Sequence, residues 1–366
     1  MATFHILAQL VFIGTCASFY GAFVNAKVSC KNAKGKDVDW FVVYKIPKTK
    51  HNAESFKQPN GGEMAYYDSE SRSSRWTLLP RDIGHKSDNP IANTLAPMYK
   101  KSSKVAYLAY NDQLPHNFNG TRQGHTKGVL LAGQKMDMGA VWLQHSVPRF
   151  VDDVNMGYAY PTNGRENGQL FLCITFPLAT VEKISYHLQV QGANVYQTRY
   201  LPWTNAFPIF AGLLKRNYMR KLKGLQVDIL LTRKNRPVLA IAKSPKWNKD
   251  IYTQELSDKV GDSITVQSWK NGAGGAQDMY CAHKRSVTDV QVVKVQTQFG
   301  ALVFSSREDH SKWSVTSTKA VFCFSSLNRM VSQWKRGGEI TCIADTPLAE
   351  LFRNSIYKRS SCKRER

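Results

Sequence analysis

The feature that most constrains this 366-residue chain is a short polar pattern that occurs twice. His-x-Lys stands at His125–Lys127 and again at His310–Lys312, about 185 residues further along. Strand-like sequence and a glycine-rich or polar connection lie beside each copy. We therefore expect two similar lobes, each contributing one His-x-Lys unit to a shared site, although the two halves show no overall similarity that is visible by eye.

Apolar and β-branched runs predict strands in both halves. The first-half strands are expected at 38–47, 104–112, 127–133, 140–148 and 170–176. The second-half strands are expected at 223–232, 237–244, 289–300 and 320–326. A helix with a basic tail is expected over 205–223, and an exposed loop over 151–170, which is rich in Gly, Asn and Pro. Strands mixed with occasional helices indicate the α/β class, with mixed α+β layers.

The N-terminus has the character of a secretory signal peptide over residues 1–26. Residues 6–24 carry no Asp, Glu, Lys or Arg, and 24–26 resemble a signal-peptidase site, so cleavage is expected before Lys27. A membrane anchor is the alternative, but the apolar run is short and interrupted by polar residues. No later stretch has the roughly 18 uninterrupted apolar residues of a spanning helix, so we expect no stable membrane insertion.

The cysteine count fits a secreted protein. Removing residues 1–26 takes away Cys16 and leaves an even number of cysteines, which suggests three disulfides with many alternative pairings. None of them forms Cys-x-x-Cys, which argues against a zinc or redox site. The sequon Asn119-Gly120-Thr121 predicts a glycosylated surface loop in the same compartment.

The formal net charge is +23 at pH 7, and the leader contributes none of it. Such a field attracts polyanions, namely nucleic acid, anionic lipid surfaces or sulfated polysaccharide, and charge alone does not choose among them. The basic run 213–224 fits either a solvated helix face or a contact with a DNA backbone. The tail 357–366 would add phosphate affinity, while His116 and the pair His283–Lys284 are interpreted as exposed surface groups.

The bare His-x-Lys pattern is not specific, but its chemistry is informative. In an extended segment, residues i and i+2 point to the same face, so each histidine would project together with its lysine. Two facing lobes would present two imidazoles and two ammonium groups to one pocket. One neutral histidine could attack phosphorus while the other, protonated, donates to the departing oxygen. The lysines would bind the non-bridging oxygens in place of a divalent metal.

Several longer segments carry a resemblance to a known family. The sequences GHTKGVLL (124–131), VDWFVVYK (38–45), AYNDQ (109–113), WLQHSVPRF (142–150) and EDHSKW (308–313) resemble the signature segments of deoxyribonuclease II, a family of the phospholipase D superfamily. The resemblance spans the chain from Cys30 to Cys362. Ser326-Leu327-Asn328 matches the superfamily's Ser-x-Asn, whereas no acid follows Lys312 at the usual place.

This resemblance implies the fold and the site. It implies a phospholipase D-like pseudo-dimer with lobes at 27–180 and 181–366, each a mixed β-sheet flanked by helices, with a shared active site between them. The residues implied for that site are His125, Lys127, His310, Lys312, Asn328 and His145; a structural hydrogen bond of a buried strand histidine remains the alternative for His145. The resemblance also implies the disulfide pairs Cys30–Cys173, Cys281–Cys362 and Cys323–Cys342.

The expected function is an acid endodeoxyribonuclease that needs no cofactor or metal and leaves 3′-phosphate and 5′-hydroxyl ends. Its partner would be DNA, contacted at the backbone without sequence preference, and its compartment the lysosome or the extracellular fluid. Three alternatives stay open: a phospholipase D-like phosphodiesterase with another substrate, a secreted basic deoxyribonuclease acting as a venom-type toxin, and a polyanion-binding protein with a decayed site.

Overall fold

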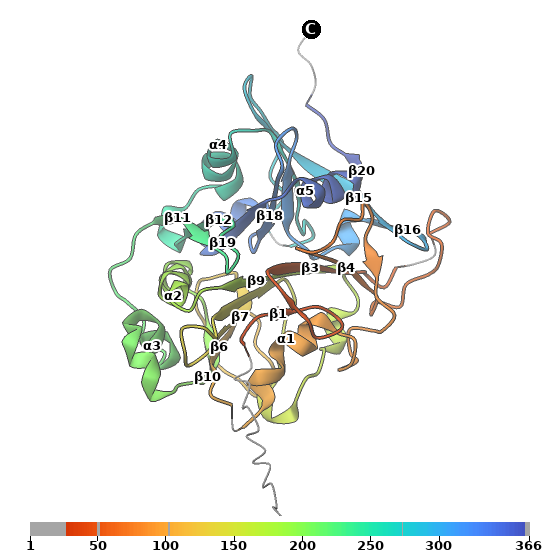
Figure 1. The fold of residues 1–366 in the computed structure, drawn as a ribbon. Helices are drawn as coiled ribbons and strands as arrows, with labels where there is room; N and C mark the ends of the chain where they lie inside the picture. Colours follow the sequence, from red (N-terminus) through yellow and green to blue (C-terminus); the bar gives the residue numbers. More distant parts are fainter. Residues whose placement is uncertain (1–26, 50–51, 102, 273, 363–366) are drawn as a thin grey trace, which may run out of the picture.

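The computed structural model describes residues 27–362 except 50–51, 102 and 273. The expected signal peptide at 1–26, together with Cys16, lies outside the described residues. Figure 1 shows two sheet-rich lobes stacked on each other, with helices beside and between them. The fold is therefore mixed α/β, as the alternation of strand-like and helical segments predicts.

The first lobe is built on an eight-stranded antiparallel sheet in the order β10-β6-β7-β8-β9-β3-β4-β5. Its strands, in chain order, are β3 (Trp40–Lys45), β4 (Met64–Asp68), β5 (Thr77–Leu78), β6 (Ala106–Asn111), β7 (Lys127–Ala132), β8 (Ala140–His145), β9 (Gln169–Phe176) and β10 (Val195–Arg199). A separate short ribbon, β1 (Cys30–Lys31) with β2 (Asp37–Val38), precedes them.

The second lobe contains a ten-stranded sheet whose path runs β11-β12-β19-β18-β17-β13-β15-β14, with β16 and β20 also paired to β15. Its strands are β11 (Leu225–Leu231), β12 (Pro237–Lys243), β13 (Ile264–Gln267), β14 (Tyr280–Cys281), β15 (Ser286–Thr297), β16 (Gly300–Ser305), β17 (Trp313–Thr316), β18 (Val321–Ser325), β19 (Gly338–Ala344) and β20 (Ile356–Arg359). Only β13 and β15 are parallel among its pairs with a described register.

The two sheets repeat one connection pattern. In the first lobe β7, β8 and β9 lie side by side and β3 joins next to β9; in the second β17, β18 and β19 are followed in the same way by β12. A helix follows β9 and another follows β19. The chain crosses from the first sheet to the second between β10 and β11, which is later than the expected division at residue 180.

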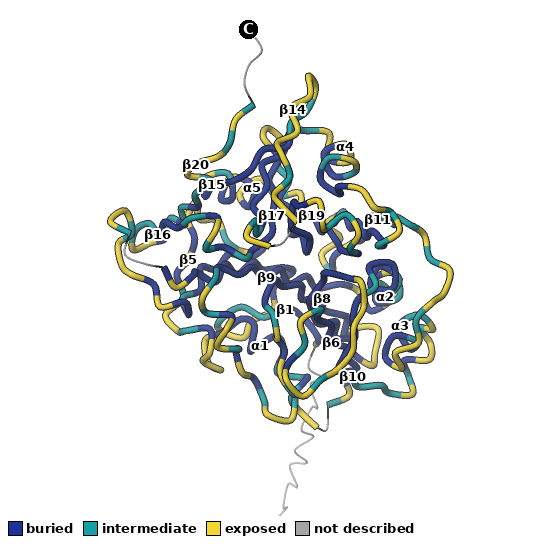
Figure 2. The backbone as a smooth tube through the Cα atoms, turned by 180° about the vertical axis from the view of Figure 1, so that it is seen from behind, coloured by how far each residue is buried: buried dark blue, intermediate teal, exposed yellow. Residues whose placement is uncertain are grey.

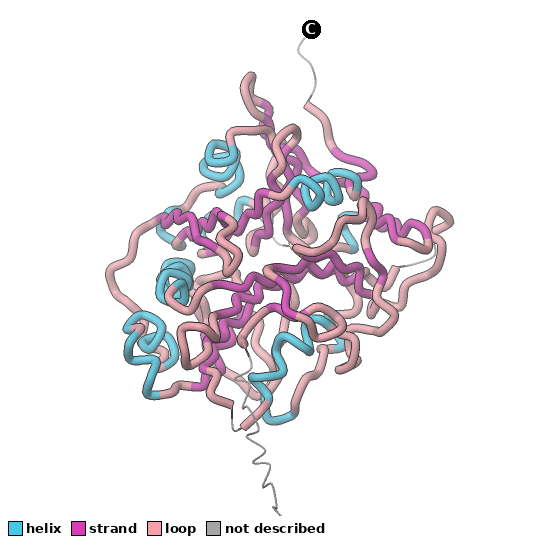
Figure 3. The backbone as a smooth tube through the Cα atoms, viewed as in Figure 1, coloured by secondary structure: helices cyan, strands magenta, loops and turns pink. Residues whose placement is uncertain are grey.

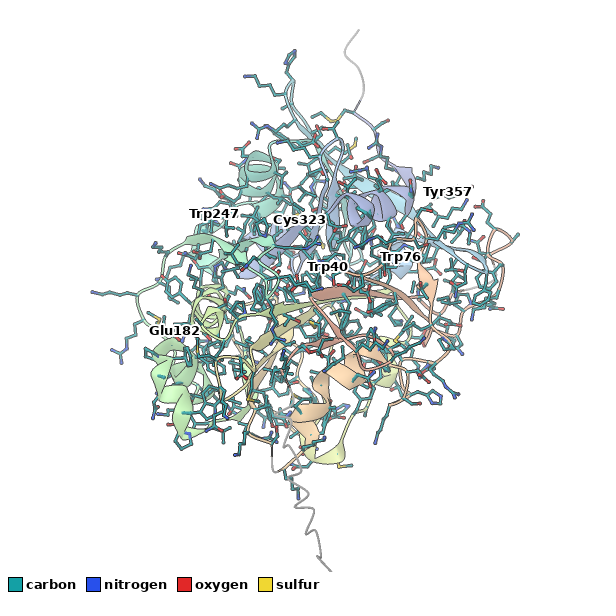
Figure 4. The ribbon with its side chains drawn as sticks, in the orientation of Figure 1. Trp40, Trp76, Glu182, Trp247, Cys323 and Tyr357 are labelled. Carbon is teal, nitrogen blue, oxygen red and sulfur yellow. A yellow bond between two sulfur atoms is a disulfide. The ribbon has the colours of Figure 1, made fainter. Side chains whose placement is uncertain are left out.

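Five α-helices occur in the described part of the chain: α1 (Pro90–Tyr99), α2 (Thr180–Gln191), α3 (Pro208–Leu214), α4 (Ser257–Val260) and α5 (Thr346–Asn354). Polar caps start two of them, because Asn89 and Asp345 accept hydrogen bonds from the first-turn amides of α1 and α5. The carboxylate of Glu182 in α2 accepts from the amides of Ile209 and Phe210 and so anchors the start of α3 (Figure 4). These contacts fix where the helices begin.

The main core lies between the two sheets. It joins apolar side chains of both sheets with those of α2, α3 and α5, and Trp40 and Trp76 stand in the middle of the molecule (Figure 4). A second cluster covers the outer face of the first sheet beneath α1, and a third covers the outer face of the second sheet beneath α4. Figure 3 shows how the helices lie around the strands of the two sheets. Figure 2 shows that the strands at the centre are buried and that many of the surrounding loops are exposed.

All three expected disulfides are present. Cys30–Cys173 ties β1 to β9, Cys323–Cys342 joins the neighbouring strands β18 and β19, and Cys281–Cys362 ties β14 to the end of the described chain. Cross-links of this kind restrict the unfolded chain most when they close long loops, and Cys30–Cys173 spans 143 residues. The pairing therefore holds each lobe covalently as well as by its core.

Two local expectations were only partly right. The helix expected over 205–223 ends at Leu214, and the basic residues that follow form an irregular crossover in which Arg216 has a left-handed backbone (φ 58°). The segment 151–170 forms the expected loop as far as β9, and Asp152 and Met156 are exposed, yet Val151, Tyr158 and Tyr160 are buried in the outer core of the first lobe. The segment is mostly polar, so its composition did not indicate that these apolar side chains pack into the core.

The carboxyl group of Glu339 lies at the junction of the two lobes. Glu339 of β19 is 1% exposed, and its Oε1 lies 3.0 Å from the hydroxyl of Thr126. Gln191 is the other partner of that hydroxyl, also at 3.0 Å. Burial raises the pKa of Glu339 from 4.5 to about 7, although Thr126 and Lys127 act in the opposite direction. Between these two pH values, Glu339 is therefore mostly protonated in the folded protein and mostly ionised in the unfolded chain.

The raised pKa of Glu339 predicts that part of the free energy of unfolding depends on pH. Because the folded pKa is raised, the contribution of Glu339 to the free energy of unfolding should fall as the pH rises from about 4.5 through 7. Between pH 5 and pH 8 the contribution is about 2 kcal/mol, from linkage. Glu339→Gln should remove it, so the difference in unfolding free energy between parent and variant, measured by urea titration, should change by that amount. A difference independent of pH would contradict the assignment.

Candidate active site

Both His-x-Lys units stand at the start of equivalent strands. His125 precedes β7 and Lys127 is its first residue, while Lys312 directly precedes β17. The first unit shows the expected alternation. Lys127 Nζ donates to Asp112 Oδ1, and His125 Nε2 lies 3.9 Å from Asp112 Oδ2, whereas Thr126 points the other way, towards Glu339. Histidine and lysine therefore share one face of the strand.

The lobes are joined immediately beside each histidine. The amide of His125 donates to the carbonyl of Gly337 over 2.8 Å, and the amide of His310 donates to the carbonyl of Gly168 over the same distance. Each contact belongs to a parallel β-bridge between lobes. A Cβ on Gly337 would lie 2.0 Å from the carbonyl oxygen of Gln191, so the backbones approach more closely than another residue would allow.

Each imidazole is also held by the opposite lobe. His125 Nδ1 lies 2.8 Å from the carbonyl oxygen of Ser326, and His310 Nδ1 lies 3.0 Å from that of Ser146. A carbonyl oxygen only accepts, so Nδ1 carries the hydrogen in both rings. In the neutral form, the Nε2 atom of each ring therefore keeps a free lone pair. In His125, this Nε2 atom faces Asp112. The orienting groups are therefore backbone carbonyls, in place of the aspartate absent after Lys312.

The charges of the two units act on one another. Burial, followed by the charge of Lys127, lowers the pKa of His125 to about 3, while Asp112 opposes this and Lys312 adds to it. Burial, Lys312, Lys127 and His125 lower the pKa of His310 well below its usual range. Burial and Lys127 likewise lower the pKa of Lys312, whose Nζ donates to the carbonyl of His310 over 2.6 Å. The four side chains form one electrostatic cluster at the junction of the lobes.

Asp112 and Arg336 are members of this cluster that sequence reasoning did not name. Burial acts to raise the pKa of the Asp112 carboxyl, but Lys127, His125 and Arg336 outweigh it and hold the pKa well below its usual range. Arg336 Nη2 lies 3.3 Å from Asp112 Oδ2. Asp112 lies inside the segment 109–113 that carries the family resemblance, so the sequence did contain a signal for this residue. No comparable motif in the sequence indicates Arg336.

The two remaining expected residues are Asn328 and His145, and both are buried. Asn328 follows β18 and is 7% exposed, and its Oδ1 is buried without a hydrogen-bond partner in the described part of the chain. His145 ends β8, packs against the rings of Phe150 and Phe171, and accepts a hydrogen bond from the amide of Val147 at Nδ1. Burial and the charge of Lys127 lower the pKa of His145, so it lies near the cluster although it is set among aromatic rings.

Other residues are placed as surface groups. Asn119 of the sequon, His116, His283 and Lys284 are all exposed. Within residues 27–362 and outside the gaps, no three His, Cys, Asp or Glu side chains gather as a possible metal site. Over the same residues, no helix is both long and apolar enough to cross a membrane.

Comparison with known proteins gives a consistent family. A family model described as Deoxyribonuclease II matches residues 29–362. The chain is 30% identical to Plancitoxin-1 of Acanthaster planci, with 92% of each chain covered. It is 32% identical to Deoxyribonuclease-2-alpha of Rattus norvegicus, covering 92% of this chain and 95% of that one. It is 31% identical to Deoxyribonuclease-2-beta of Homo sapiens, covering 97% and 96%.

The matched region contains both lobes, both His-x-Lys units and all six disulfide-bonded cysteines. A match of this length, with relatives of 30% identity or more over nine-tenths of the chain, leaves one assignment. The chain belongs to the deoxyribonuclease II family.

Proposed function

We propose that this protein is an acid endodeoxyribonuclease that hydrolyses DNA without a divalent metal, through a phosphohistidine intermediate, and leaves 3′-phosphate and 5′-hydroxyl ends. Its two lobes would form a phospholipase D-like pseudo-dimer with one active site at their junction. The observation that carries the proposal is the matched pair of imidazoles, each fixed through Nδ1 by a carbonyl of the opposite lobe, with Nε2 left for chemistry.

In the first step His125 Nε2 attacks the scissile phosphorus, and the bond to the 5′ oxygen breaks. Protonated His310 gives its Nε2 proton to that oxygen, so the 5′ fragment leaves as an alcohol. In the second step neutral His310 takes a proton from water, which attacks the phosphorus and breaks the nitrogen–phosphorus bond. The 3′ fragment then leaves with the phosphate, and the reaction needs no further reactant.

The lysines and Asn328 would hold the phosphate. Lys127 and Lys312 are buried and close enough to lower the pKa of both histidines, so a phosphate entering the cluster meets concentrated positive charge. Their interaction with the non-bridging oxygens grows as charge develops in the transition state. In the free protein Asp112 holds Lys127, and we expect the phosphate to compete with Asp112 for that ammonium group.

The acid preference follows from the same charges. The general acid must carry a proton, yet burial and the lysines favour the neutral imidazole. A bound phosphate opposes the lysines and favours protonation. The rate should therefore fall at high pH, where His310 loses its proton, and at low pH, where His125 gains one. Because the two rings interact, these limits belong to the pair.

The lysosome and the extracellular fluid are the proposed compartments. The high positive charge and the similarity to a protein named Plancitoxin-1 favour a secreted, toxin-like role as the second candidate. Immunolocalisation separates the two: gland and secretion for the second candidate, phagocytic lysosomes for the first.

Substitution of each histidine should separate their roles. With plasmid DNA, His125→Ala and His310→Ala should each lower the nicking rate by at least about 10³-fold. With a thymidine 3′-(4-nitrophenyl phosphate) diester, the nitrophenolate leaves without a proton, so His310→Ala should still release a stoichiometric burst of nitrophenol while His125→Ala should not. His116→Ala, an exposed histidine outside the cluster, is the matched control. A burst from His125→Ala and none from His310→Ala would reverse the two roles.

Metal independence is tested by digestion in excess chelator at acid pH. The expected products carry 3′-phosphate and 5′-hydroxyl ends, detected because polynucleotide kinase labels the 5′ ends without prior dephosphorylation. Loss of cleavage in chelator with recovery on adding magnesium would contradict the mechanism, as would 5′-phosphate ends.

Asp112 should set one limb of the pH–rate profile. Its negative charge raises the pKa of His125, so Asp112→Asn should make His125 harder to protonate. If His125 is the nucleophile, the acid limb of kcat/KM should move to lower pH by roughly half a unit to one unit. Asp152→Asn, at an exposed position, is the control. Movement of the alkaline limb alone would make His125 the general acid.

A further inference from the structure

A groove outside the His-x-Lys cluster carries charge that the proposed chemistry does not use. We call it the cationic groove; it has a volume of about 350 Å³. Its charged and polar walls come from Arg122 and Gln123 before β7, Arg220 of the crossover, and Ser244 with Lys246 at the end of β12. Segments of both lobes therefore build it, and one wall is the irregular basic run that replaced the expected helix.

The charge of this groove is unopposed. Arg122, Arg220 and Lys246 are exposed, and none of the three forms an ion pair among the described residues. No Asp or Glu lines the groove. The guanidinium of Arg122 lies 3.6 Å from the ring centroid of Tyr218, which holds its side chain in place without neutralising it. Three cations around a concave surface without a counter-charge favour an anionic ligand.

A buried polar atom in the groove also lacks a partner. Ser244 is 6% exposed and lines the groove, and its Oγ has no hydrogen-bond partner in the described part of the chain. A buried hydroxyl left unpaired costs free energy, and a ligand oxygen would satisfy it. Gln123 adds an exposed amide to the same lining.

Hydrogen bonds of Arg336 connect the edge of the groove to the His-x-Lys cluster. Arg336 Nε donates to the carbonyl of Gln123 over 2.9 Å, and its Nη2 reaches both the carbonyl of Gly124 and Asp112. Gln123 lies only two residues before His125. Arg336 therefore links the edge of the groove to the carboxylate beside His125, and the groove is a neighbour of the proposed position of the scissile phosphate.

We propose that the cationic groove is a subsite for the sugar–phosphate backbone of the DNA strand beside the scissile phosphate. This rests on the proposed function and adds where the flanking strand binds. The lining contains no aromatic side chain on which a base could stack, so the groove would read phosphates and not bases. Arg122, Arg220 and Lys246 are the residues that would bind those phosphates.

The test compares a groove variant with a matched control. The groove variant is Arg122→Gln with Arg220→Gln and Lys246→Gln. The control is Lys34→Gln with Lys36→Gln and Lys101→Gln, which removes the same charge from exposed positions that do not line the groove. Each set is also combined with His310→Ala, so that binding to a fluorescent duplex is measured by anisotropy without cleavage.

In the groove variant, the slope of log affinity against log salt should become shallower by about 0.9 for each phosphate that the groove no longer binds, up to two or three units in all. Cleavage of plasmid DNA should fall by about tenfold or more at low salt. Turnover of the thymidine 3′-(4-nitrophenyl phosphate) diester, which is too short to reach the groove, should change by less than about twofold if the groove binds only the flanking strand. The control should keep the parent slope.

Two results would overturn the subsite: a salt slope equal to that of the control variant, or an equal reduction of activity on the small diester and on plasmid. Failure of the proposed function is a separate result, because the parent would then cut neither substrate in chelator. The salt dependence is measured by DNA binding and not by cleavage. It therefore tests whether the groove binds phosphates even if the proposed catalytic mechanism is wrong.

Discussion

The structure depends on two backbone contacts that cross between the lobes. His125 and His310 each donate their amide to a glycine carbonyl of the opposite lobe, and each imidazole binds a serine carbonyl there. Position and ring orientation are therefore set by the same junction. If one lobe shifted, both histidines would be separated from their partners together, since neither is oriented by its own lobe alone. The large core between the sheets keeps this junction in register.

The junction concentrates charge that burial makes costly. Two lysines and two imidazoles share a region with the carboxylate of Asp112, whose pKa is held low, and burial together with the neighbouring positive charges lowers the pKa of Lys312 and of both imidazoles. An incoming phosphate relieves this imbalance, so the same feature that destabilises the free site favours the proposed substrate. The carboxyl of Glu339 lies on the opposite face of the first His-x-Lys unit and responds to pH within the core. Acid conditions thus suit both the proposed chemistry and this part of the fold.

Sequence reasoning predicted the features that leave a local or familiar pattern. The expected strands around β3, β7, β8 and β9 are present because buried strands leave continuous apolar runs, and the three disulfides follow the pairing that the family resemblance implied. It failed over 205–223, where apolar spacing suggested a helix but the backbone turns left-handed at Arg216. It also did not identify Arg336, because no motif near residue 336 indicates a contact with Asp112, 224 residues earlier in the chain.

By itself, the sequence determined the class of fold, the strand that carries the first His-x-Lys unit, and the chemical groups of both units. These follow from side-chain periodicity and residue type, which are local properties. Only the tertiary structure decided which groups meet: the carbonyls of Ser146 and Ser326 across the junction, Arg336 beside Asp112, and the cations of the cationic groove. Such meetings depend on how two sheets pack, and backbone carbonyls are identical in every residue, so no spacing in the sequence could identify the ones that hold the imidazoles.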